Sequence, residues 1–311
     1  MSASIVVIGS LNMDFVFSVE RLPLPGETIL GRSFQTVPGG KGANQAFAAA
    51  KLVRGGTAVR MIGRVGVDSF GQALKANLAG VDVGSVIETV GVSTGVASIQ
   101  VDDAGQNSIT VAPGANNVLS PADLDQRVFD GARCVLLQLE IPLETVTEGL
   151  RAGRRAGAIC ILDPAPARAL PLEILELVDI ATPNENEACL LAGVQANRLS
   201  VDDAAAIGHK LRGLGVGAVI MKLGDQGCVY CGPDGTIVSP PFPVQAVDST
   251  AAGDTFNAAL AVALSESAKM EDALRFANAA AAISVTRAGA QTSAPGRAEV
   301  DALLAKAGSL G

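Results

Sequence analysis

The stretch VDSTAAGDTFNAAL, residues 247–260, decides how the rest of this chain is interpreted. Three small residues precede Asp254, and apolar residues at helical spacing follow it, namely Phe256, Ala259, Leu260, Ala263 and Leu264. Asp254 is therefore expected in the first turn of a helix. Because the preceding side chains are so small, the backbone N–H groups there are bare and predict an anion site.

Asp254 has two interpretations, a helix cap or a reagent. Aspartate is favoured at helix starts because its oxygens accept N–H groups that lack an acceptor within the helix. Ser249 and Thr250 already stand in front of this helix, and we expect them to provide the cap. Under that expectation the carboxylate of Asp254 is free for chemistry if an anion binds beside it.

The composition favours a large folded chain without nucleic-acid or membrane partners. The 311 residues are 49% apolar and 17% charged, as in an ordinary folded protein. A net charge of −8 disfavours nucleic acids and anionic membranes, which usually recruit basic surfaces. We see no signal-like leader and no run of about 18 apolar residues, and the five cysteines are scattered, so we expect a cytoplasmic protein.

Short apolar runs alternate with helical stretches along most of the chain. Strands are predicted at residues 5–8, 59–63, 134–139, 159–162, 179–182 and 218–223. Helices are predicted at residues 42–53, 70–79, 143–156, 185–192, 202–214, 253–266, 270–287 and 297–306. This alternation predicts an α/β fold, a single domain over residues 1–311 in which helices cover both faces of a mostly parallel sheet.

Two regions break the alternation and predict a small second sheet. Residues 12–38 and 94–111 contain alternating strand patterns separated by turns, and we expect antiparallel strands that form a lid. So few strands cannot bury two faces, and Val16, Ile99 and Val101 are candidates for the remaining apolar face. The lid is expected to cover that face by closing over a ligand, by pairing with a second copy, or by both.

Polar residues follow the predicted strands where each one ends, at Asn12, Asp14, Glu140, Asp163, Asn184 and Glu187. The carboxyl ends of the strands in an open α/β sheet line a ligand cleft. Mixed donors and acceptors suit a neutral polyhydroxylated ligand, because each hydroxyl both donates and accepts. A phosphate would instead favour clusters of arginine and lysine.

The stretch PGGKGANQA, residues 38–46, is the second strong signal. It is not the phosphate loop of nucleotide-binding proteins, because glycine rather than serine or threonine follows Lys41. Gly39 and Gly40 permit unusual backbone angles and close approach to a ligand. Lys41 and Asn44 then offer donors at a helix start, although a plain glycine hinge before a helix would give the same letters.

Cysteine and histidine chemistry finds little support. Cys228 and Cys231 form a C-x-x-C pair, but no second ligand pair accompanies them and the run is β-like, so we expect a structural role. The single histidine, His209, is expected on an exposed helix face, which argues against a Ser-His-Asp triad.

These motifs together resemble the PfkB family of carbohydrate kinases, and within it the ribokinase branch. The resemblance runs almost end to end and rests on GSLNMD (9–14), PGGKGANQA (38–46), LQLE (137–140), DPAPAR (163–168), TPNENEA (182–188), KLGDQG (222–227) and DSTAAGDTFN (248–257). The last of these is the specific signature of the family, and GGKGANQ points to the ribokinase branch.

The resemblance implies a role for each matching position. A sugar set would bind ribose, namely Asn12, Asp14, Gly40, Lys41, Asn44, Glu140 and Asp254. A nucleotide set would bind ATP, namely Asn184, Lys222, Leu223, Gly224, Asp225, Gln226, Gly227, Gly253 and Asn278. Glu187 closes an N-x-x-E motif linked to Mg²⁺. A potassium set comprises Asp248, Thr250, Ser284, Arg287, Gly289 and Ser293.

Two positions depart from the family pattern. Asn278 stands where a histidine is familiar beside the adenine, so contacts with the base are left open. Asp163 stands where asparagine is frequent, and we expect no consequence.

The resemblance implies ATP-dependent phosphorylation of the 5-hydroxyl of D-ribose by a homodimer joined through the lid. Asp254 would be the base, and Ala251, Ala252 and Gly253 would form with it a backbone anion hole for the γ-phosphoryl group. The helix start is expected to keep Asp254 ionised.

Two alternatives remain at this stage. The first is a nucleoside kinase or another sugar kinase of the same family. Stacking partners for a base are scarce, with one tyrosine, no tryptophan and nine phenylalanines. The second is a non-catalytic sugar sensor, which the intact A-A-G-D run disfavours.

Overall fold

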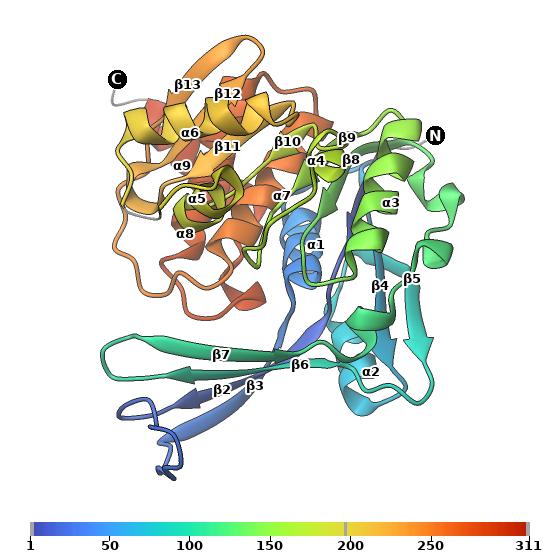
Figure 1. Cartoon of the computed structure of the whole chain (residues 1–311), viewed down its shortest axis with the longest axis vertical. Helices are drawn as coiled ribbons and strands as arrows, with labels where there is room; N and C mark the ends of the chain where they lie inside the picture. Colours follow the sequence, from blue (N-terminus) through green and yellow to red (C-terminus); the bar gives the residue numbers. More distant parts are fainter. Residues whose placement is uncertain (1–2, 196–197, 309–311) are drawn as a thin grey trace.

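The computed structural model describes residues 3–195 and 198–308, and these contain a large sheet and a small one (Figure 1). The large sheet has the strand order β13-β12-β11-β10-β9-β8-β1-β4-β5. The strands are β1 (Ser4–Ile8), β4 (Ala58–Gly66), β5 (Val81–Thr89), β8 (Ala132–Leu137), β9 (Ile159–Leu162), β10 (Ile180–Ala181), β11 (Ala218–Lys222), β12 (Cys228–Gly232) and β13 (Gly235–Ser239). All neighbours pair in parallel except β11 with β12 and β12 with β13.

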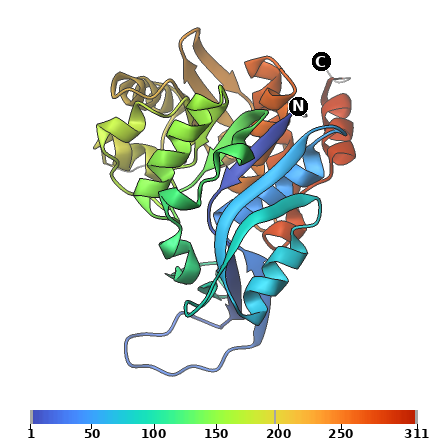
Figure 2. The same cartoon turned by 90° about the vertical axis from the view of Figure 1, so that its right-hand side faces the viewer.

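Helices form a layer on each face of the large sheet (Figure 2). One layer contains α1 (Lys41–Leu52), α2 (Ser69–Asn77), α7 (Ala252–Ser265), α8 (Met270–Ser284) and α9 (Arg297–Gly308). The other contains α3 (Leu143–Arg155), α4 (Leu172–Leu175), α5 (Glu185–Ala192) and α6 (Val201–Gly213). Short 3₁₀ turns lie at Gly114–Val118, Pro121–Asp123, Gln126–Phe129, Gly224–Gln226 and Gln291–Ser293.

Each core strand is apolar on both faces, and its residues alternate between two buried clusters. In β1, Ile5 and Val7 join the cluster under α1 and α7, whereas Val6 and Ile8 join the cluster under α3. Two apolar faces per strand require a helix layer on each side, which confirms the predicted three-layer sandwich. None of the described helices is long and apolar enough to cross a bilayer.

The small sheet has the order β3-β2-β6-β7, with β2 (Asn12–Ser18), β3 (Ser33–Gly39), β6 (Gly95–Val101) and β7 (Asn107–Ala112). It projects from the body at the bottom of Figure 1. The expectation of purely antiparallel strands is wrong for its central pair, because β2 and β6 are parallel. Two antiparallel hairpins, β2–β3 and β6–β7, leave the body, and their outgoing strands lie side by side.

The pairing register divides this lid into two faces. Val16 lies opposite Ile99, Ile99 lies opposite Ile109, and Val101 is two positions further along the same face, as predicted. Asp14 belongs to that face too, since alternate residues of a strand point the same way. The other face carries Phe15, whose ring lies 5.5 Å from the ring of Phe70 in α2. The apolar face with Asp14 therefore points away from α2.

Most helix boundaries match the prediction within two or three residues, whereas β5, β13 and the short helix α4 were not predicted as elements. Cys228 and Cys231 are buried in β12 and belong to different core clusters, on opposite faces of the sheet. They cannot bind one metal together, in agreement with a structural role. His209 is exposed on α6, as expected, where its Nε2 lies 2.9 Å from the Thr236 hydroxyl.

Candidate active site

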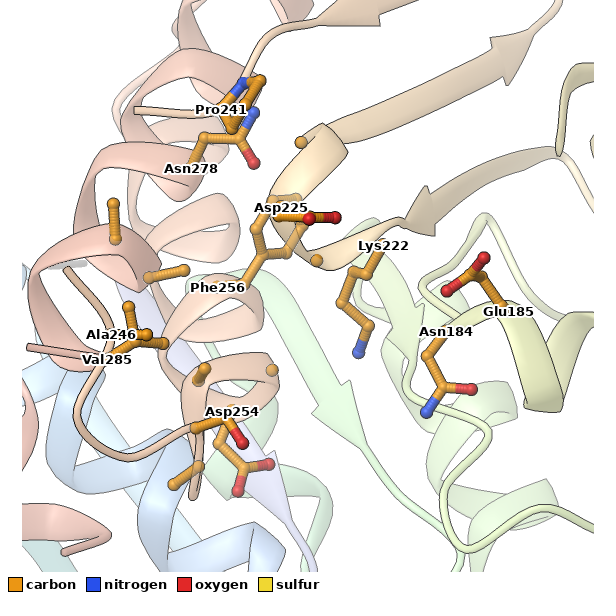
Figure 3. A pocket seen from close by; sticks show the side chains of 18 of the residues that line it. Asn184, Glu185, Lys222, Asp225, Pro241, Ala246, Asp254, Phe256, Asn278 and Val285 are labelled. Carbon is orange, nitrogen blue, oxygen red and sulfur yellow. The ribbon is translucent and has the colours of Figure 1, made fainter. Parts of the chain in front are cut away.

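The polar strand ends lie at one edge of the sheet, because β11, β10, β9, β8 and β1 are consecutive neighbours. A cavity of about 820 Å³ opens there (Figure 3). It extends from Lys41, Asp163 and Asp254 to Asn278 and is walled by the starts of α5 and α7. Its size is typical of a small-molecule site.

The start of α7 is open, as the small residues before Asp254 predict. Ala251 occupies the cap position in a left-handed conformation with φ 57°, and no side chain caps the helix. The expectation that Ser249 or Thr250 would cap is wrong, because only the backbone carbonyl of Ser249 approaches, accepting the Ala252 N–H at 3.2 Å. The first N–H groups of a helix lack acceptors within it, so those of Gly253 and Asp254 are left for a ligand.

The carboxylate of Asp254 does not cap α7 either. It is 5% exposed and points to α1, where Asn44 Nδ2 donates to Oδ2 at 3.0 Å and Gln45 Nε2 donates to Oδ1 at 3.0 Å. Burial raises the pKa of Asp254 to about 6, against the opposing charge of Lys41. The carboxylate is thus mostly ionised at pH 7 and able to accept a proton.

Gly39 and Gly40 bring backbone against the polar residues of β2. A Cβ on Gly39 would lie 2.0 Å from Asp14 Oδ2, and one on Gly40 would lie 2.7 Å from the Asn12 nitrogen. Gly40 also has φ 89°, which other residues rarely adopt. The unusual backbone angle that was predicted is present at Gly40, and both glycines leave room for neighbouring residues of β2.

The sugar set lies beside the cavity and meets it at Lys41 and Asp254, the two members that also line it. Glu140 accepts the Lys41 backbone N–H at 3.1 Å. Burial raises the pKa of Asp14 to about 7, and the charges of Glu140 and Asp254 add to the rise. Burial lowers the pKa of Lys41, but nearby carboxylates, Asp254 foremost, outweigh it and raise the pKa.

The start of α5 faces the same cavity but is closed by its own side chains. The Glu187 N–H donates to Asn184 Oδ1 at 2.9 Å, and Glu187 Oε2 accepts the Asn184 backbone N–H at 2.8 Å. Burial raises the pKa of Glu187, and the charge of Lys222 opposes that rise. The start of α5 therefore presents the buried carboxylate of Glu187 to the cavity rather than open N–H groups.

Lys222 at the end of β11 points into the cavity (Figure 3). Its Nζ lies 3.0 Å from Asp163 Oδ1 and would be 3.3 Å from a Cβ on Gly253. Gly224, Asp225 and Gly227 also line the cavity, but Leu223 and Gln226 do not. Leu223 is 2% exposed, and the Gln226 side chain donates to the Leu199 carbonyl at 3.2 Å.

The far end of the cavity is apolar, walled by Phe242, Val244, Ala246, Ala281 and Val285. Asn278 lines the cavity there, and its Nδ2 donates to the Ser239 hydroxyl at 3.0 Å. The amide thus fixes the start of the segment that carries Phe242. An apolar slot with few polar groups suits a flat ring.

The potassium set lies before α7 and around the end of α8, and several of its expected ligands are backbone carbonyls. Asp248 accepts the N–H groups of Thr250 and Gly289, each at 2.8 Å, and joins the loop before α7 to the loop after α8. Although burial raises the pKa of Asp248, these bonds hold it below its usual range. The side chains of the other three members have partners nearby: Ser284 and Ser293 donate to carbonyls of their own turns, and Arg287 pairs with Glu299.

The donor sets fit metals only in part. Within the described ranges, no group of three or more histidine, cysteine, aspartate or glutamate side chains could hold a metal alone. Mg²⁺ commonly binds one or two carboxylates together with substrate phosphates, and Glu187 at the cavity wall fits that use. The loops joined by Asp248 can offer backbone carbonyls to a monovalent cation.

Sequence reasoning missed four side chains that shape the site, namely Ser10, Gln45, Asn116 and Gln138. The Ser10 hydroxyl donates to Glu140 at 2.5 Å, and Asn116 Nδ2 donates to Asn12 Oδ1 at 2.8 Å. Asn116 lies 104 residues from Asn12, so no local pattern could have found it. Gln45 sits inside the quoted GGKGANQ run and could have been noticed there.

Comparison with known proteins agrees with this geometry. The family model described as pfkB family carbohydrate kinase matches residues 2–297. The chain is 44% identical to a ribokinase of Bacillus subtilis, covering 97% of this chain and 99% of that one, and 42% identical to a ribokinase of Haemophilus influenzae, covering 96% and 97%. A structure of Arabidopsis thaliana ribokinase complexed with ribose and ATP matches with a TM-score of 0.89 and 37% identity over 98% and 99% of the chains. This chain therefore belongs to the PfkB family of carbohydrate kinases.

Proposed function

We propose that the chain is an ATP-dependent kinase that transfers the γ-phosphoryl group of ATP to the 5-hydroxyl of D-ribose, giving D-ribose 5-phosphate and ADP. One observation carries the proposal. The buried carboxylate of Asp254 lies at the open start of α7, where the large cavity meets the sugar set. A hydroxyl held at Asp254 would face a phosphoryl group held at the helix start.

The oxygen of the ribose 5-hydroxyl attacks the γ-phosphorus while Asp254 accepts the proton of that hydroxyl. ADP leaves on the opposite side of the phosphorus. The free N–H groups of Gly253 and Asp254, in an anion hole whose small size depends on Ala251 and Ala252, stabilise the charge on the transferring oxygens. The sugar set orients ribose so that this hydroxyl approaches in line. ATP lies along the cavity, with its phosphates beside Lys222 and Gly253 and its base in the apolar slot near Asn278.

Mg²⁺ would be held by the ATP phosphates and Glu187 and would neutralise phosphate charge. Potassium would occupy the loops that Asp248 joins, near carbonyls of the segment 284–293. A cation there would order the backbone before α7 without touching either substrate, and this motivates potassium as an activator.

We also propose a single kinase domain that forms a homodimer through the lid. The lid face that carries Val16, Ile99 and Asp14 continues from the sugar set, and Ile109 on that face is 54% exposed. Closure over ribose or pairing with a second copy would cover it and exclude water. Light scattering at micromolar concentration should give the dimer mass, and Ile109→Lys should give the monomer mass. A monomeric parent, or a dimer that survives Ile109→Lys, would remove this interface.

A cytoplasmic location completes the proposal. The five cysteines are buried and free, as suits a reducing compartment.

The test of the activity is an ADP-release assay across pentoses, hexoses and nucleosides. We expect D-ribose to give the highest kcat/KM. A higher value for a nucleoside would favour the nucleoside kinase instead. Calorimetric binding of ribose without ADP release from any mixture would favour the sugar sensor.

A further inference from the structure

Gln45 is fully buried and lies between two carboxylates. Its Nε2 donates to Asp254 Oδ1 at 3.0 Å and to Asp163 Oδ2 at 3.3 Å. The other oxygen of Asp163 accepts from Lys222 Nζ at 3.0 Å. One amide therefore joins the carboxylate on the sugar side to the ion pair in the cavity.

The orientation of this amide is dictated by charge. A carboxylate without its proton only accepts hydrogen bonds, so the NH₂ group of Gln45 must face both aspartates and its oxygen must face away. That oxygen accepts from Gln138 Nε2 at 2.7 Å. Gln138 Oε1 is left buried with no hydrogen-bond partner among the described residues. An orphaned carbonyl is costly, and the chain tolerates it at the end of this series.

The aspartate at position 163, where asparagine is frequent in the family, has a consequence for the site. Its side chain is 4% exposed and pairs with Lys222, whose side chain is 15% exposed. The pair holds the ammonium group next to Gly253, at the open start of α7. An asparagine at position 163 could accept a hydrogen bond from Lys222 but would lack the opposite charge that strengthens it.

We propose that Gln45 and Asp163 are positioning residues: Gln45 fixes the carboxylate of Asp254 against α1, and Asp163 holds Lys222 over the start of α7. The inference rests on the proposed function, in which Asp254 is the base and the start of α7 receives the phosphoryl group. The base Asp254 and the phosphoryl group at the start of α7 would then be aligned with each other through the side-chain amide of Gln45.

Several charged and polar groups face Asp254, and their effects on its pKa have known signs. The Lys41 ammonium and the amides of Asn44 and Gln45 lower the pKa, whereas the charge of Asp163 raises it. Two further carboxylates lie nearby, because the pKa of Asp14 responds to both Glu140 and Asp254. Removing the Gln45 amide and removing the Asp163 charge should therefore shift the pKa of Asp254 in opposite directions.

The test compares Gln45→Met, which keeps length but loses the donor, with Asp163→Asn, which keeps shape but loses the charge. Thr145→Val serves as a matched control, because the buried Thr145 hydroxyl donates to the Leu119 carbonyl at 2.7 Å away from the site. We expect kcat to fall about tenfold in Gln45→Met with ribose affinity within about twofold of the parent. The control should keep the parent kcat.

The pKa of Asp254 is read directly by NMR titration of ¹³C-labelled aspartate carboxylates, which needs no turnover. We expect it to rise in Gln45→Met and to fall in Asp163→Asn. Shifts in the same direction, unchanged titrations, or an equal loss of kcat in Thr145→Val would overturn the inference. If the two variants shift the pKa in opposite directions but the parent protein does not phosphorylate ribose, the proposed function is overturned and the inference stands.

Discussion

Two helices start at the same cavity, and each carries an acidic residue at its third position. In α5 that residue is Glu187, which reaches back to the N–H of Asn184 and closes the helix start. In α7 it is Asp254, which turns to α1 and leaves the helix start open. An acidic residue at the same helical position thus completes the capping pair in one helix and remains free for chemistry in the other.

The difference follows from the residue at the cap position. Asn184 has a side chain that accepts the Glu187 N–H, so a reciprocal pair forms. Ala251 has none, and its left-handed backbone turns the chain sharply into α7. Asn44 and Gln45 then supply the donors that Asp254 would otherwise seek in its own helix. The open start of α7 therefore depends on side chains of α1, a helix that is distant in the sequence but adjacent in space.

Asp254→Asn should give the largest effect, because it keeps shape but removes the proton acceptor. We expect kcat to fall about 10²-fold or more while ribose affinity is mostly retained. Steady-state kinetics and ribose calorimetry separate the two. Near-normal turnover would remove Asp254 as the base.

Asp14→Ala tests the sugar set beside the open start of α7. Ribose should bind more weakly by roughly 1–3 kcal/mol, because buried hydroxyls lose a charged acceptor. ATP affinity, measured in the same variant, is the control and should hardly change. Unaltered ribose affinity would take Asp14 out of the site.

Glu187→Gln tests the closed helix start. We expect the Mg²⁺ concentration for half-maximal activity to rise about tenfold, since a charged oxygen ligand is lost. Glu185→Gln is the matched control: Glu185 lines the same cavity and likewise accepts one backbone N–H, that of Leu199 at 2.8 Å. Equal Mg²⁺ dependence in the two variants would contradict a metal role for Glu187.

Replacing Na⁺ with K⁺ at fixed ionic strength should raise activity a few-fold by ordering the loop before α7. In Asp248→Asn, the two salts should give equal rates, because the bonds to Thr250 and Gly289 weaken. A parent enzyme that is indifferent to the cation would eliminate the potassium site.

The pH dependence should give the smallest effect near neutrality. Burial raises the pKa of Asp254 to about 6 in the free protein, and a base works only when deprotonated, so kcat should fall as the pH drops below neutrality. Saturating ribose keeps the titration of Asp14 out of the profile, since its pKa is about 7 before ribose binds. A kcat that stays flat down to pH 5 would contradict this assignment.

Local sequence was enough to predict the three layers, the helix that has Asp254 in its first turn, and the unusual backbone angle before α1. Each of these follows from the spacing of apolar residues or from the backbone freedom of glycine. Local sequence failed where partners are distant. Asn44 and Gln45 lie 210 and 209 residues from Asp254, so the donors that replace a cap could not be seen. Ser249 and Thr250 have the right chemistry for capping, but the left-handed turn at Ala251 denies them the position. The parallel pairing of β2 with β6 likewise depends on how two distant hairpins leave the body.

The most direct measurement follows the γ-phosphorus of ATP by ³¹P NMR in a mixture with D-ribose and Mg²⁺. If an open α7 start and a buried base act together, all transferred phosphorus should appear as D-ribose 5-phosphate, in a one-to-one ratio with ADP. Asp254→Asn should slow that signal without producing another. Phosphorus that appears as inorganic phosphate, or as an ester at another ribose hydroxyl, would contradict the account.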